Sequence, residues 1–236
     1  MEITILNKQY DINLKKLSLQ DNKLQSLPAE IGNLINLKDL DLSYNKLQSL
    51  PAEIGNLINL KYLSLYFNKL QSLPAEIGYL IKLENLDLPY NQLQSLPAEI
   101  GNLRNLQYLY LYHNQLQSLP PEIGNLINLI SLDLLNNKLQ SFPPEIGNLI
   151  NLQSLYLYNN QLQSLPAEIF KIKNILKIND ISYDINNLNI DNEILIFSNL
   201  INKLNNLPIN TKEIWLNSDI KNYDIKLPFD CKIKYY

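Results

Sequence analysis

Leucine and isoleucine recur along this chain at fixed intervals, separated by polar residues. From Leu14 onward close matches to one pattern, L-x-x-L-x-L-x-x-N-x-L-x-x-L-P-x-E-I-G-x-L-x-x, recur seven times with a period of 23 residues, and in the seventh copy Phe170 replaces the glycine. The copies span 14–36, 37–59, 60–82, 83–105, 106–128, 129–151 and 152–174. Apolar and polar residues alternate in L-x-L, which predicts a short strand with Leu40 and Leu42 on one face and Asp41 and Ser43 on the other. One such unit cannot bury its apolar face alone, so we expect the units to stack.

An asparagine follows each predicted strand, where the chain must turn. Its side-chain amide carries both donors and an acceptor, so stacked copies can satisfy backbone groups of the turns that water does not reach. This predicts a structural asparagine ladder of Asn22, Asn45, Asn68, Asn91, Asn114, Asn137 and Asn160.

The segment Leu-Pro-x-Glu-Ile-Gly predicts a short helical turn in each unit. Proline suits the first helical position, and the glutamate two places later faces the positive end of the helix dipole. We expect Gly32 and its equivalents to permit the turn back toward the next strand.

The complete 23-residue pattern resembles the leucine-rich repeat family, and most closely its intracellular members with an LPxEIG segment, such as Ras-group-related leucine-rich repeat proteins. The resemblance covers about two thirds of the chain. It implies an α/β repeat fold, a horseshoe-shaped solenoid with a parallel β-sheet on the concave face and short helical or 3-10 segments on the convex face. It also implies a protein-interaction module or scaffold. Regulation of a small GTPase or kinase signal-transduction pathway is one version of that function.

Both ends of the chain depart from the repeat. We expect residues 1–13 to form an N-terminal cap, and 175–236 a C-terminal cap with degenerate repeats and one helix. The helix is predicted from the spacing of Ile194, Phe197, Leu200, Ile201 and Leu204 after a capping Asp191. The Leu-Pro pairs at 207–208 and 227–228 loosely resemble divergent repeats of giant DNA viruses and some protists. The alternative is a separate recognition module.

Composition argues against most chemistry. The net charge of −3 offers no footprint for nucleic acid or an anionic membrane. A single cysteine, Cys231, excludes an internal disulfide and favours a reducing, cytoplasmic location, or a virion if the protein is viral. A single histidine, His113, leaves little for metal or nucleophilic sites. We expect no enzyme activity, no cofactor, no bound metal and no small-molecule substrate.

The variable, outward-facing strand positions are the candidate binding site. Even-numbered units carry acids and odd-numbered units carry aromatic residues. The predicted concave surface consists of Asp41, Tyr44, Tyr62, Tyr66, Phe67, Asp87, Tyr90, Tyr108, Tyr110, Tyr112, His113, Asp133, Tyr156 and Tyr158. Tyrosine is enriched in binding hot spots, and interleaved carboxylates favour a basic or amphipathic protein segment as partner. Pro89 lacks an amide donor and predicts a shortened fourth strand.

Two other functions stay open at this point. A solvent-facing row of Ile35, Ile58, Ile81, Ile127 and Ile150 on the outer side would suit a structural or assembly protein. Drift of composition toward isoleucine explains the same row without a function. The third class is an effector linked to enzyme activity.

Overall fold

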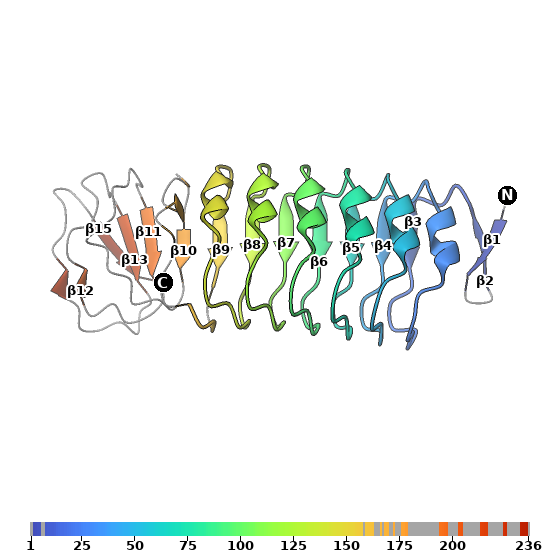
Figure 1. Cartoon of the computed structure of the whole chain (residues 1–236), viewed down its shortest axis with the longest axis horizontal. Helices are drawn as coiled ribbons and strands as arrows, with labels where there is room; N and C mark the ends of the chain where they lie inside the picture. Colours follow the sequence, from blue (N-terminus) through green and yellow to red (C-terminus); the bar gives the residue numbers. More distant parts are fainter. Residues whose placement is uncertain are drawn as a thin grey trace.

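The structure is a computed structural model that describes residues 2–5, 8–157, 159–162, 166, 168–169, 172, 176–178, 194–197, 203–204, 213–216, 224–225 and 232–235. Its main body is one parallel sheet of seven strands in chain order, one strand from each repeat (Figure 1). These strands are β3 (Lys16–Ser18), β4 (Asp39–Asp41), β5 (Tyr62–Ser64), β6 (Asn85–Asp87), β7 (Tyr108–Tyr110), β8 (Ser131–Asp133) and β9 (Ser154–Tyr156). Equivalent residues pair in register, as Leu40 does with Leu63.

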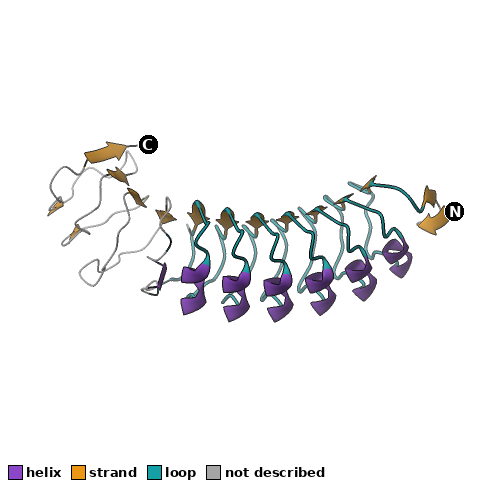
Figure 2. Ribbon diagram, turned by 90° about the horizontal axis from the view of Figure 1, so that it is seen from above, coloured by secondary structure: helices purple, strands orange, loops and turns teal. Residues whose placement is uncertain are grey.

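A 3-10 helix of five residues follows each of the first six strands. The helices are η1 (Ala29–Asn33), η2 (Ala52–Asn56), η3 (Ala75–Tyr79), η4 (Ala98–Asn102), η5 (Pro121–Asn125) and η6 (Pro144–Asn148). The proline before each helix has an extended backbone. Its carbonyl oxygen accepts the first hydrogen bond of the helix, as Pro28 O does from Ile31 N at 3.1 Å. Figure 2 shows the strands on the inner side of the arc and the helices on its outer side. The predicted fold class is confirmed.

Leucines between the two layers form a continuous core. In the second unit Leu37, Leu40, Leu42, Leu47, Ile54 and Leu57 have no exposed surface, and the equivalent positions of the third to sixth units are covered in the same way. Each unit therefore buries its apolar side chains against its neighbours, which is the main favourable term in folding.

The asparagine ladder lies beneath the loops that follow the strands. Asn45 Nδ2 donates to Leu19 O and Leu42 O, both at 2.9 Å, and Asn45 Oδ1 accepts from Leu24 N at 3.0 Å. Asn45, Asn68, Asn91, Asn114 and Asn137 are buried, and Asn22 and Asn160 at the two ends are less covered. The amide of Asn45, and that of each asparagine after it in the ladder, joins its own turn to the preceding unit, whereas that of Asn22, within the described residues, bonds only Gln20 O of its own turn.

The repeated glycine has a different role from the predicted one. No glycine in the described residues has positive φ, so a left-handed turn does not require it. A Cβ on Gly32 would instead lie 2.6 Å from Glu53 O and 2.8 Å from Glu53 Cβ in the next unit. Glycine is needed because the backbones of successive 3-10 helices approach too closely for a side chain.

The ends are built from separate sheets. Strands β1 (Glu2–Ile5) and β2 (Lys8–Asp11) form an antiparallel hairpin, and Tyr10 packs against the leucine core. Toward the C-terminus, β10 (Leu176–Ile178), β11 (Ile194–Phe197), β13 (Glu213–Leu216) and β15 (Lys232–Tyr235) form a parallel four-stranded sheet. The short strands β12 (Lys203–Leu204) and β14 (Asp224–Ile225) pair with each other.

The helix predicted after Asp191 is wrong where the structure describes that segment. Ile194–Phe197 and Lys203–Leu204 are strands, and β11 pairs in parallel with both β10 and β13. Successive partners in this sheet are 19 residues apart along the chain, at Leu176, Leu195, Ile214 and Ile233. A second, shorter repeat period therefore describes these strands. Pairing between distant segments has overridden the local helical spacing. Asp191, Leu200, Ile201 and Cys231 lie outside the described residues.

Candidate binding surface on the concave face

The predicted surface residues form four parallel rows across the strands and the turns after them. Tyr62 and Tyr108 lie in the first row, and Asp41, Asp87, Tyr110, Asp133 and Tyr156 lie in the second. Tyr66 and Tyr112 belong to the third row, and Tyr44, Phe67, Tyr90 and His113 to the fourth. None of these is buried in the core, whereas Ser43, predicted to face outward, is buried. Tyr158 lies outside the described residues.

The fourth row is continuous, and we call Tyr44, Phe67, Tyr90 and His113 the aromatic row. The ring centroids of Tyr44 and Phe67 are 5.5 Å apart, those of Phe67 and Tyr90 5.8 Å, and those of Tyr90 and His113 4.3 Å. Tyr44 is 46% exposed, Phe67 51% and Tyr90 37%, and His113 is also exposed. The row runs through four consecutive units, so the alternation of acidic and aromatic units seen in the sequence does not describe it.

The backbone of the aromatic row is strained. Tyr44, Phe67, Tyr90 and His113 have φ between 53° and 55°, in the left-handed region, which tyrosine and phenylalanine rarely adopt although histidine is more frequent there. The same position in the outer units holds Asp21, Asn136 and Asn159, which tolerate this conformation. The sequence shows that aromatic rings replace Asp and Asn at this position, but only the structure shows that the position has a left-handed backbone.

A hollow of about 440 Å³, which we call the concave hollow, lies beside this row. Its walls combine the carboxylates of Asp41, Asp87 and Asp133 with the rings of four tyrosines, at 62, 66, 110 and 112. The Tyr62 hydroxyl donates to Asp87 Oδ2 at 2.8 Å. The hollow is therefore an acidic site with aromatic walls, which can hold a cationic or polar group beside apolar surface.

The three aspartates differ in how the backbone caps them. Asp41 Oδ1 accepts from Ser43 N at 2.9 Å, and Asp133 Oδ1 accepts from Leu135 N at 3.0 Å. The equivalent residue after Asp87 is Pro89, which has no N–H, and Asp87 Oδ1 is buried without a hydrogen-bond partner. The predicted shortening of the fourth strand is wrong, because β6 keeps three residues. Pro89 acts instead by removing the backbone N–H that would donate to the Asp87 carboxylate.

Burial changes the ionisation of groups around the concave hollow. It raises the pKa of Asp133 to about 6, although the bond from Leu135 N opposes the shift. Burial also raises the pKa of Asp87, and the hydrogen bond from Tyr62 opposes that rise. Burial also raises the pKa of Tyr62 and of Tyr112 to about 12; the hydrogen bond to Asp87 adds to the rise at Tyr62, and the neighbouring tyrosines and carboxylates add to it at Tyr112.

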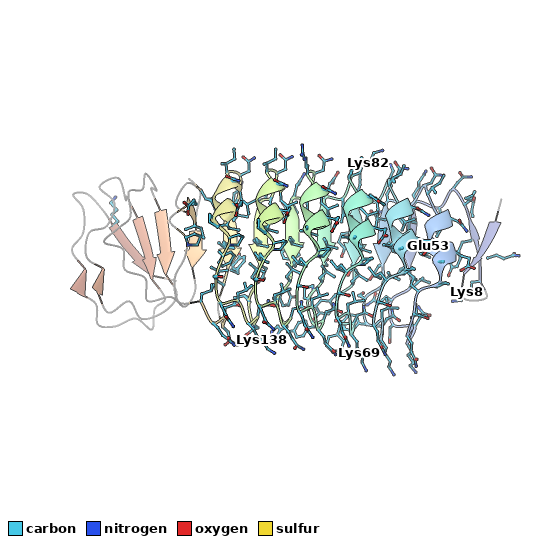
Figure 3. All side chains as sticks on the ribbon, viewed as in Figure 1. Lys8, Glu53, Lys69, Lys82 and Lys138 are labelled. Carbon is cyan, nitrogen blue, oxygen red and sulfur yellow. The ribbon has the colours of Figure 1, made fainter. Side chains whose placement is uncertain are left out.

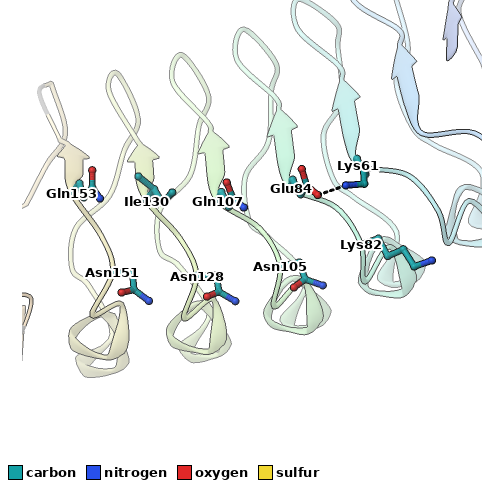
Figure 4. A pocket seen from close by; sticks show the side chains of 9 residues that line it. All are labelled: Lys61, Lys82, Glu84, Asn105, Gln107, Asn128, Ile130, Asn151 and Gln153. Atoms are coloured by element: carbon teal, nitrogen blue, oxygen red, sulfur yellow. Dashed lines mark hydrogen bonds and ion pairs between the residues drawn. The ribbon is translucent and has the colours of Figure 1, made fainter. Parts of the chain in front are cut away.

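A second hollow of about 650 Å³ lies on the lateral flank, between the strand starts and the 3-10 helices (Figure 4). Part of its lining is a second asparagine ladder that sequence reasoning missed. Asn105 Nδ2 donates to Ile81 O, Asn128 Nδ2 to Arg104 O and Asn151 Nδ2 to Ile127 O, each at 2.8 Å. The signal was an asparagine repeating at a 23-residue interval. These amides hold neighbouring units together, so we interpret this flank as structural.

The residues of the predicted isoleucine row are exposed. Ile35, Ile58, Ile81, Ile127 and Ile150 are 48% to 59% exposed, and Arg104 occupies the same position in the fourth unit. Among the described residues, no group of three or more His, Cys, Asp or Glu side chains is arranged to hold a metal ion. In that same part of the chain, no helix is long and apolar enough to cross a bilayer.

Comparisons with known proteins agree with this architecture. Residues 52–138 match a family described as "Leucine-rich repeat region", 12–70 match "Leucine rich repeat", and 128–149 and 151–172 match a further leucine-rich repeat family. Comparison with curated proteins gave no match.

Solved structures extend the likeness to nearly the whole chain. A leucine-rich repeat protein of Leptospira interrogans is 27% identical with a TM-score of 0.50, over 95% of this chain and 79% of that one. The plant peptide hormone receptor RGFR1, solved in complex with RGF2, is 26% identical with a TM-score of 0.59, over 94% of this chain and 45% of the receptor chain. From the repeats, the parallel sheet and these matches together, the chain belongs to the leucine-rich repeat family.

Proposed function

We propose that this chain is a non-catalytic protein-interaction module that binds a segment of a partner protein along its concave face. Leucine-rich repeat domains are generally protein-interaction modules, and the similar plant receptor was solved in a complex. The aromatic row is the observation that carries the proposal. Asparagine or aspartate suits the left-handed position, yet the second to fifth units hold exposed rings there. A ring at such a position costs about 1–2 kcal/mol, which binding can offset.

The neighbouring tyrosines extend this surface across the turns. The Tyr66 ring centroid lies 5.2 Å from that of Tyr44 and 5.5 Å from that of Tyr90, in edge-on geometry. The Tyr112 ring packs edge-on against Tyr90 at 5.5 Å. Rings held by each other lose little freedom when a partner binds, so they supply contact area at low entropic cost.

The test replaces three rings of the aromatic row at once, Tyr44→Asn, Phe67→Asn and Tyr90→Asn. A library of random peptides displayed on phage is selected against the unaltered protein, and enriched peptides are synthesised for titration. We expect the triple variant to bind them at least about 100-fold more weakly, because each hot-spot ring contributes about 1 kcal/mol or more. Its thermal stability should change little, since relief of backbone strain offsets the lost ring contacts of about 0.5–1.5 kcal/mol each.

The matched control replaces Ile35, Ile58 and Ile81 with asparagine on the outer face. This triple variant should bind the peptides as the unaltered protein does. Failure to enrich any peptide, or equal binding by the aromatic-row variant, would count against the proposal.

Self-association through the isoleucine row is the second candidate function. The exposure of five isoleucines along one outer edge favours it. Light scattering separates the two functions, because an assembly protein forms oligomers that the control variant loses.

A further inference from the structure

The concave hollow carries negative charge that the protein itself does not neutralise. Among the described residues, the outward positions of β3 to β9 carry one basic side chain, Lys16, and its Nζ pairs with Asp39 at 2.6 Å. The other described ion pair joins Lys61 and Glu84 on the flank. Lysines gather elsewhere, and Figure 3 places Lys69 and Lys138 at one lateral edge of the solenoid and Lys82 at the other.

Asp87 is the least satisfied of the carboxylates in the hollow. Its Oδ2 accepts one bond, from the Tyr62 hydroxyl, while Oδ1 has no partner because residue 89 is a proline. Leaving a buried acceptor unpaired costs about 1–3 kcal/mol or more for a charged group. A carboxylate is one charge shared by two oxygens, so a cation in the hollow stabilises it even without touching Oδ1 directly.

The tyrosine rings that line the concave hollow also favour a bound cation. Tyr62 and Tyr112 are neutral at physiological pH, since the ordinary pKa of tyrosine is about 10 and burial raises the pKa of both further. A neutral ring attracts a cation to its face by about 0.5–2 kcal/mol, and its edge packs against the methylene groups of a long side chain. The volume of about 440 Å³ is at the small end of ligand pockets, so one side chain with its flanking backbone fits better than a folded surface.

From these contacts we propose that the concave hollow receives a single cationic side chain, lysine or arginine, from the bound segment, with Asp87 and Asp133 as its counter-charges. The proposal rests on the proposed function, since it names the chemistry that a partner must carry. The aromatic row binds the apolar part of the segment, and the hollow decides its register by accepting the one cation.

A double-mutant cycle between protein and peptide tests this pairing. An enriched peptide is synthesised with its cation intact and with a neutral analogue at that position, which is citrulline for arginine; where the cation is lysine, Nε-acetyllysine takes the place of citrulline. Affinities for both peptides are measured on the unaltered protein and on Asp87→Asn, which keeps an oxygen for the Tyr62 hydroxyl. We expect citrulline to weaken binding to the unaltered protein at least 10-fold, and to weaken binding to the Asp87→Asn variant far less. Asp133→Asn is measured in the same way.

The exposed carboxylate of Glu53 on η2 provides the matched control, because Glu53→Gln removes the same charge from the outer face. It should leave the citrulline effect unchanged. Equal loss on the unaltered protein and on both aspartate variants would overturn the inference, as would enriched peptides without lysine or arginine. In either case the aromatic row could still bind peptides, so the proposed function would stand. Only loss of peptide enrichment altogether would remove both.

Discussion

Replacing Pro89 with serine would restore to the fourth unit the amide that caps an aspartate in the second and sixth. Ser43 N donates to Asp41 Oδ1 at 2.9 Å, and Leu135 N donates to Asp133 Oδ1 at 3.0 Å. In the Pro89→Ser variant the new N–H should reach Asp87 Oδ1 in the same way, because β6 pairs in the same register as its neighbours. A hydrogen bond to a charged group contributes about 1.5–3 kcal/mol.

Stability of this variant should depend on pH in a defined direction. Burial raises the pKa of Asp87 above its ordinary value of about 3.9. The charged form is therefore disfavoured in the folded state. The contribution of Asp87 to stability is therefore fully present below the ordinary pKa, where the carboxyl is protonated, and is lost as pH rises through the raised pKa of the folded state. The new donor lowers the raised pKa, so the variant should lose less stability over that range.

Urea unfolding at pH 4 and pH 7.5 measures the effect, provided that the slope m stays the same. Losing proline's restriction of the unfolded chain costs about 0.4–1 kcal/mol. That cost, and the loss of buried proline carbons, apply at both pH values and cancel in the comparison. A protonated carboxyl also accepts the new bond, at about 0.5–1.5 kcal/mol. The variant's stability relative to the unaltered protein should therefore be higher at pH 7.5 than at pH 4, by about 1 kcal/mol.

Asp87→Asn supplies the control, because an amide does not titrate. Adding Pro89→Ser to Asp87→Asn should change stability by the same amount at both pH values. If the single Pro89→Ser variant also shows a difference that does not vary with pH, its new amide does not cap Asp87. The explanation of the unpaired carboxylate would then be wrong.

Two further predictions concern the scaffold, and both are measured by urea unfolding. Gly78→Ala should destabilise the protein by about 1–3 kcal/mol, because its Cβ would lie 2.7 Å from Glu99 O of the next unit; an unchanged midpoint would show that glycine is not required for close packing. Asn91→Ala should cost about 2–5 kcal/mol, because it leaves Leu65 O, Leu88 O and Leu70 N without the buried amide that bonds them. Asn105→Ala, in the exposed second ladder, should cost under about 1 kcal/mol, and an equal loss from both variants would contradict the role of burial.

Periodicity identified the stacked strands and the asparagine ladder because each depends on residues repeated at one position. Leu40 pairs with Leu63, and Asn45 donates to Leu19 O, because residues at equivalent positions of neighbouring repeats have the same surroundings. The candidate surface followed from the same logic, since positions facing away from the core are free to vary. Where the period weakens, near Ile194, local spacing suggested a helix and long-range pairing produced a strand.

The sequence by itself determined which leucines are buried and, apart from Ser43, which residues face outward from the strands, because a strict period leaves one way to stack the units. Only the tertiary structure decided how closely neighbouring units approach and which aspartates accept a backbone hydrogen bond. It also decided at which residues the backbone is left-handed. These properties depend on distances between different units, such as that from Gly78 to Glu99, and on φ angles such as that of Phe67. A pattern of residue types along one chain contains neither quantity, which is why the roles of the glycine and of Pro89 emerged only from the folded stack.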